Sequence, residues 1–105
     1  MKIKHGDKGF HFTTESGYVL SVQYGAGNYC ENQHISFDAR GEAVPESEDC
    51  EIAIWKVGPG NQPFLDLNGD QVANRVPIAL IPQILVDLQG ERMECVLHTL
   101  EYDDQ

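Results

Sequence analysis

Cysteine and histidine side chains are the groups in this sequence that could act as nucleophiles or hold a metal ion. Cys30 and His34 lie four residues apart, and catalysis by Cys30 with His34 or His98 would require a lowered thiol pKa. Glu31 directly follows Cys30, and a neighbouring carboxylate disfavours the thiolate. A closed metal site needs three or four converging ligands, and the spacing here matches none. The sequence therefore predicts no catalytic residue, no metal site and no cofactor.

A second candidate site is the glycine-rich segment 25–32, which directly follows an aromatic residue. Glycine at two of its first three positions permits positive φ or the close approach of a ligand to the backbone. The segment has neither the G-K-[ST] nor the G-x-G-x-x-G pattern of a phosphate loop. Two interpretations stay open: a tight hairpin corner with tyrosines packed beneath it, and a site for a small anion or nucleotide. The residues of that site would be Tyr24, Gly25, Gly27, Asn28 and Tyr29.

The carboxylates form the third candidate site. The 105 residues include 17 acidic and 7 basic side chains, a net charge of −10, which repels phosphate backbones and disfavours direct nucleic-acid binding. Segment 38–51 is acidic and contains Gly41 and Pro45, so it predicts a solvated loop. This loop either only keeps the protein in solution or binds a partner with a basic surface, by attraction that weakens with salt. The predicted contact residues are Glu42, Glu46, Glu48, Asp49 and Glu51.

The composition is that of a folded chain. Apolar residues make up 41%, and the length suits one domain, which we expect to span residues 1–105. The longest apolar stretch, residues 76–86, contains two prolines and is shorter than the roughly 18 residues of a membrane span. No apolar leader follows the first residues, and three widely spaced cysteines suit a reducing compartment. We therefore expect a cytoplasmic protein that does not contact a membrane.

Alternating side chains predict the strands that would position these sites. Segment 9–24 alternates apolar and polar residues around a Glu-Ser-Gly turn, which predicts a β-hairpin. Short strands are predicted at 33–37 and 64–67. Segment 52–57 is apolar on both faces and predicts an interior strand. If no helix covers the second face of the sheet, Val19 and Trp55 would form a homodimer contact.

Proline and glycine limit the helices. Pro77 and Pro82 exclude a continuous helix through their region, whereas Pro82 suits the first turn of a helix over about 82–90 that ends at Gly90. Segment 92–102 fits either a strand or a helix. The apolar face of the first helix would be formed by Ile81, Leu85 and Leu88. The expected fold is α+β: a mostly antiparallel sheet that starts with a β-hairpin, with one or two helices packed near the C-terminus.

Two segments of the sequence resemble segments of a known group of proteins. Residues 17–32 read GYVLSVQYGAGNYCEN, and residues 47–55 read SEDCEIAIW. They resemble small proteins of tailed bacteriophages and prophages with a G-Y-x-x-S-V-Q-aromatic-G-x-G-N-Y-C-acidic-N signature, an acidic loop and an S-x-x-x-E-[VI]-A-[VI]-W strand. The last third matches poorly, because those proteins often continue into a helix without prolines, whereas this chain has Pro77 and Pro82.

The resemblance implies a small phage gene product that acts on the host cell, and no reaction is attached to the group. Small acidic phage proteins are often inhibitors of host defence, including anti-CRISPR proteins. The resemblance thus implies a non-enzymatic inhibitor of a host bacterial protein with a basic surface, such as a CRISPR-Cas defence complex. The alternative from the residues is a binder that sequesters a nucleotide signal through Gly25–Asn32.

Overall fold

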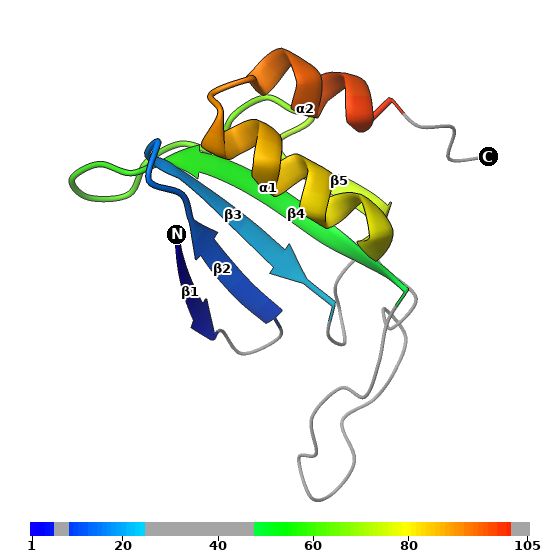
Figure 1. Ribbon diagram of the computed structural model, residues 1–105, viewed down its shortest axis with the longest axis horizontal. Helices are drawn as coiled ribbons and strands as arrows, with labels where there is room; N and C mark the ends of the chain where they lie inside the picture. The colour runs from blue at the N-terminus through cyan, green and yellow to red at the C-terminus, as the bar shows by residue number, and fades with distance from the viewer. Residues whose placement is uncertain (6–8, 25–47, 102–105) are drawn as a thin grey trace, which may run out of the picture.

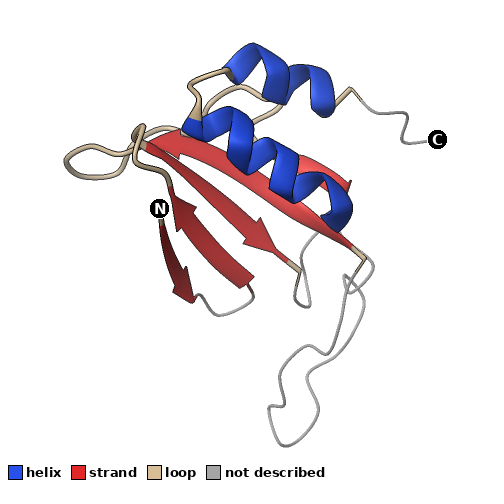
Figure 2. Ribbon diagram, in the orientation of Figure 1, coloured by secondary structure: helices blue, strands red, loops and turns tan. Residues whose placement is uncertain are grey.

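The computed structural model describes residues 1–5, 9–24 and 48–101. They form a five-stranded antiparallel sheet, in chain order, with two helices packed on one face (Figure 1; Figure 2). The elements are β1 (Lys2–His5), β2 (Gly9–Thr13), β3 (Tyr18–Gln23), β4 (Asp49–Lys56), β5 (Ala73–Pro77), the 3₁₀ turn η1 (Ile78–Leu80), α1 (Ile81–Gln89) and α2 (Met93–Thr99). The predicted α+β class is confirmed, as are the antiparallel sheet and the C-terminal helices. No helix in these ranges is both long and apolar enough to cross a membrane.

The predicted hairpin over 9–24 is β2 and β3. Phe12 lies opposite Leu20 across the pair, and the Thr14 hydroxyl accepts a 3.0 Å hydrogen bond from the Tyr18 backbone N–H in the turn. Gly17 has a φ of +98°, a left-handed conformation that glycine adopts without steric cost. The sheet nevertheless begins one hairpin earlier, because β1 pairs with β2. The alternation pattern did not predict β1.

The second half of the sheet differs from the prediction in two places. Strand β4 lies between β3 and β5, as the apolar character of 52–57 predicted, but it begins at Asp49. Residues 49–51 are therefore strand, and the prediction of a loop up to residue 51 was wrong there. The strand predicted at 64–67 was also wrong: Leu65 donates one backbone hydrogen bond of 2.7 Å to Ile54, without a regular ladder. On the side away from β3, β4 pairs with β5 and not with segment 64–67.

Helix α1 begins and ends within one residue of the limits that proline and glycine predicted. Pro82 is the second residue of α1, and the Gly90 N–H donates to the Val86 carbonyl at 3.0 Å to close the last turn. The buried apolar residues of α1 are Ile81, Ile84 and Leu88. Leu85, predicted for this face, is only partly buried. Segment 92–102, for which strand and helix were both open, contains α2.

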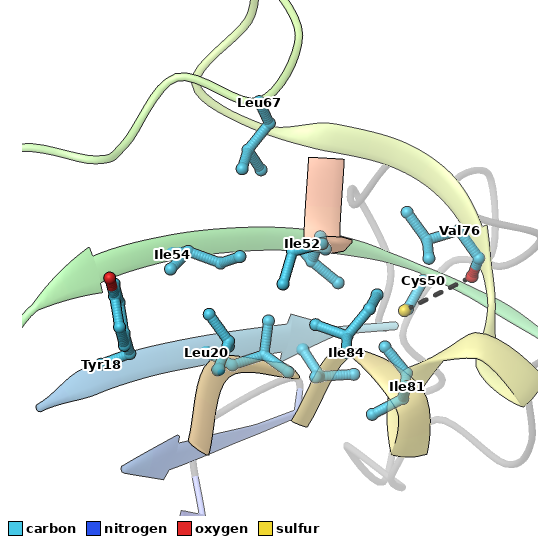
Figure 3. Close-up of a cluster of buried hydrophobic side chains, with 12 residues drawn as sticks. Tyr18, Leu20, Cys50, Ile52, Ile54, Leu67, Val76, Ile81 and Ile84 are labelled. Carbon is cyan, nitrogen blue, oxygen red and sulfur yellow. Dashed lines mark hydrogen bonds between the residues drawn. The ribbon is translucent and has the colours of Figure 1, made fainter. Parts of the chain in front are cut away.

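The core lies between the helices and the part of the sheet formed by β3, β4 and β5. Figure 3 shows Leu20, Ile52 and Ile54 on the sheet, facing Ile84 of α1, and all four side chains are fully buried. Val96 of α2 completes the cluster. No residue of β1 belongs to this buried cluster.

A buried carboxylate fixes the corner between α1 and α2. Asp87 is 4% exposed, and its Oδ1 accepts from Arg92 Nε at 3.3 Å and from Gln83 Nε2 at 3.2 Å. We expect Asp87→Ala to lower the free energy of unfolding by about 1–3 kcal/mol, because a charge-assisted hydrogen bond is lost. Urea denaturation followed by circular dichroism measures the change. The exposed Glu91→Gln is the control and should change stability by less than about 0.5 kcal/mol; equal losses would contradict this assignment.

Candidate functional site

The described part of the predicted acidic site lies at the start of β4. Glu48, Asp49 and Glu51, hereafter the β4 carboxylates, fall within the described residues, whereas Glu42 and Glu46 lie outside them. Glu48 is exposed, and Asp49 and Glu51 are half-buried. The Glu48 carbonyl accepts a 2.9 Å hydrogen bond from the Ile78 N–H. Asp49 and Glu51 are therefore held by the sheet backbone, contrary to the predicted loop, whereas Glu48 precedes the strand and is bonded to η1.

A β-bulge in β5 supplies a basic neighbour to this group. The register of β4 against β5 shifts at Glu51, which faces two residues of β5, Asn74 and Arg75. Arg75 has a φ of +52°, and its Nη1 lies 3.9 Å from Asp49 Oδ2. The Arg75 side chain is 56% exposed, so this ion pair contributes at most about 1 kcal/mol. The Arg75 guanidinium therefore offsets part of the negative charge of the β4 carboxylates.

Strand alternation places the Asp49 and Glu51 side chains on the face of the sheet opposite the helices. Cys50 and Ile52 point into the core, so Asp49 and Glu51 point the other way. We call this second face the open face. Its strand residues are Lys2, Lys4, His11, Thr13, Val19, Ser21, Gln23, Asp49, Glu51, Ala53 and Trp55. Carboxylates therefore lie at its β4–β5 side and lysines at its β1 side.

Aromatic rings occupy the centre of the open face. Trp55 is half-buried; its ring stacks on Phe64 with centroids 5.3 Å apart and meets His11 edge-on at the same centroid distance. Val19 lies directly opposite Trp55 in β3 but is only 8% exposed. Within the described residues both helices pack on the other face, and Val19 offers little surface to a second copy. The homodimer stays a prediction that gel filtration tests.

The structure describes only one residue of the glycine-rich candidate site, Tyr24. Tyr24 is half-buried and packs against the core, and its ring lies 6.1 Å from that of Phe10. This packing agrees with a tyrosine beneath a hairpin corner and leaves less of the ring for a base. Gly25, Gly27, Asn28 and Tyr29 lie outside the described residues. The nucleotide site therefore stays a prediction.

Two of the three cysteines, Cys50 and Cys95, lie in the described segments. Cys50 is fully buried, and its thiol lies 3.5 Å from the Val76 carbonyl oxygen as a weak donor. Cys95 is partly buried in α2. Cys30 and His34 lie outside the described residues. Within residues 1–5, 9–24 and 48–101, no group of three or more His, Cys, Asp and Glu side chains is arranged to hold a metal ion.

The sequence did not predict a hollow at the β1 end of the open face. It measures about 530 Å³ and is lined by Met1, Lys2, Thr13, Thr14, Glu15, Gly17 and Val57. Its wall depends on the pairing of Lys2 with Thr13. Because β1 itself was not predicted, no local signal indicated that these residues meet.

Searches of family models, of curated proteins and of solved structures found no match for this chain.

Proposed function

We propose that this protein is a non-enzymatic inhibitor of phage or prophage origin that binds a host bacterial protein with a basic surface in the cytoplasm of the host cell. The observation that carries the proposal is the excess of carboxylates: a net charge of −10 for the chain, with three acidic residues gathered at the start of β4 beside Arg75. Such a surface attracts lysine- and arginine-rich partners from a distance.

The strand backbone favours binding by these carboxylates. Asp49 and Glu51 belong to β4, which pairs with β3 and β5 on both sides, and the Glu48 carbonyl is bonded to Ile78. Less backbone entropy is lost on binding when the contacting residues are already ordered. The negative potential then acts mainly on the association rate, and salt screens it over about 10 Å at 0.1 M ionic strength.

The proposed class of target follows from this charge. Proteins that bind DNA or RNA use lysine and arginine to contact phosphates, and a carboxylate-rich surface competes for the same side chains. Among such targets, the phage-type resemblance in residues 17–32 and 47–55 favours a host defence complex of the CRISPR-Cas type. In this proposal the protein occupies the nucleic-acid groove and performs no covalent chemistry.

We expect neutralisation of the acidic site to weaken binding to the captured host protein. The test variant changes Glu42, Glu46, Glu48 and Glu51 to Gln and keeps Asp49, which pairs with Arg75. Tagged wild type captures partners from a bacterial lysate at low salt, and the affinity of the purified partner is then measured at two salt concentrations. The variant should bind at least about tenfold more weakly, and its affinity should depend less on salt.

The matched control removes the same number of charges elsewhere. Asp70→Asn with Glu91, Glu94 and Glu101→Gln changes four exposed carboxylates outside β4 and should leave the affinity within about twofold of wild type. If both variants lose affinity equally, net charge and not the β4 site explains binding. If neither variant loses affinity, the electrostatic mechanism is wrong.

A further inference from the structure

The outer edge of β1 is an exposed border of the sheet. β1 pairs with β2 along one side only, and no strand of the described residues pairs with its other side. All four residues of β1 are exposed. Alternate backbone N–H and C=O groups of an edge strand point outward, where they can pair with a strand supplied by another chain.

The opposite edge is less suited to such pairing. β5 ends at Pro77, which lacks a backbone donor, and Arg75 has a φ of +52° within the strand. Proline and a left-handed residue both interrupt the regular hydrogen-bond ladder that an added strand needs. β1, in contrast, keeps an uninterrupted register with β2 from Lys2 to His5.

The side chains of β1 present different chemistry on the two faces of the sheet. Lys2 and Lys4 lie opposite Thr13 and His11 on the open face. Ile3 lies on the other face and is 61% exposed.

An aromatic strip, formed by His5, Phe10 and Phe12, continues from Ile3 on the face of the sheet that carries the helices. The His5 ring meets Phe10 edge-on at 5.4 Å, and the Phe12 ring lies 6.5 Å from Phe10. Phe10 and Phe12 are half-buried, and Phe12 packs against the core, so Ile3 and His5 are the exposed residues of this strip. A strand added at β1 would thus meet ammonium groups on one face and an apolar surface on the other.

We propose that the outer edge of β1 binds an extended peptide segment in which acidic and apolar residues alternate, added to the sheet as a sixth strand. The period of two in a strand puts every acidic side chain of such a segment beside Lys2 and Lys4 and every apolar side chain beside Ile3 and His5, which are the β1 residues on the other face. The same lysines disfavour pairing between two copies of β1, because like charges would meet. This surface is separate from the β4 carboxylates and has the opposite charge.

The probe is a fluorescein-labelled peptide of alternating Glu and Val. Two comparison peptides carry Lys in place of Glu, or the same Glu and Val residues in two separate blocks. We expect the wild-type chain to bind the alternating acidic peptide at least about tenfold more tightly than either comparison, with amide hydrogen exchange slowed in β1 and unchanged in β5. No binding, equal binding of the block peptide, or slowed exchange elsewhere than β1 would overturn the proposal and leave Lys2 and Lys4 only as residues that prevent aggregation.

Charge variants complete the test. Lys2→Glu with Lys4→Glu should weaken binding about tenfold, and the corresponding Gln variant should show a smaller loss. Lys56→Glu is the control, because Lys56 is an exposed lysine of β4 whose ammonium group lies over the Tyr18 ring; its binding should stay within about twofold. An equally large loss of peptide affinity in Lys56→Glu would contradict binding at β1. The four-site acidic variant should bind the peptide as wild type does, so the two proposals can fail separately.

Discussion

Replacing Ile84 with alanine is expected to lower the free energy of unfolding by about 2–5 kcal/mol. Ile84 is fully buried, and Figure 3 shows its side chain between α1 and the sheet residues of the core. The loss combines the transfer free energy of the removed methyl and methylene groups with the cost of the cavity left behind. Domains of this size are stable by only about 5–15 kcal/mol. Urea denaturation monitored by circular dichroism measures the loss.

Val86→Ala is the control for Ile84. Val86 lies on the same helix but is 55% exposed, and alanine favours a helix more than valine does. We expect this variant to differ from wild type by less than about 0.5 kcal/mol. A loss comparable with that of Ile84→Ala would mean that α1 packs through a different face.

The second large effect is expected for Gly9→Val. Gly9 lies in β2 opposite Gln23, and a Cβ atom there would sit 1.8 Å from the Val22 carbonyl oxygen and 2.8 Å from its carbonyl carbon. These are backbone atoms of β3, so they cannot move aside as a flexible side chain can. We expect the β2–β3 pairing to open at this end and the free energy of unfolding to fall by at least about 3 kcal/mol. Urea denaturation measures the fall, and hydrogen exchange locates the opening.

Gly58→Val separates this close contact from the general cost of replacing a glycine. A Cβ at Gly58 would meet only the side chain of Gln62, at 2.7 Å, and both residues lie in the segment between β4 and β5. Gln62 can rotate away, so the expected change is below about 1 kcal/mol. Similar losses at both glycines would show that close approach to β3 is not the cause.

The two proposed surfaces lie at opposite sides of one sheet. Lys2 and Lys4 belong to the first strand in the sheet order, and the β4 carboxylates lie next to the last strand. This separation of charge gives the protein a basic edge although its net charge is −10. Net charge taken from the composition could not reveal it, because the composition does not say which strand lies at the edge.

Local signals in the sequence were sufficient to predict several of the strands and helices. Apolar alternation predicted the hairpin over 9–24, and apolar residues on both faces predicted that 52–57 is interior, because side-chain period and burial act within a few residues. Pro82 and Gly90 predicted the limits of α1, since each restricts its own backbone. These features follow from the chain alone, and they established the α+β class.

Only the tertiary structure decided the remaining elements and the composition of the sites. The Lys-Ile-Lys-His segment of β1 has little strand pattern of its own, and it becomes a strand by pairing with β2. Asp49 and Glu51 looked like loop residues, but β3 and β5 supply the hydrogen bonds that hold them in β4. Arg75 meets Asp49 across a bulge. Strand edges and side-chain meetings of this kind depend on residues far apart in the chain, and a sequence pattern confined to one segment contains no information on them.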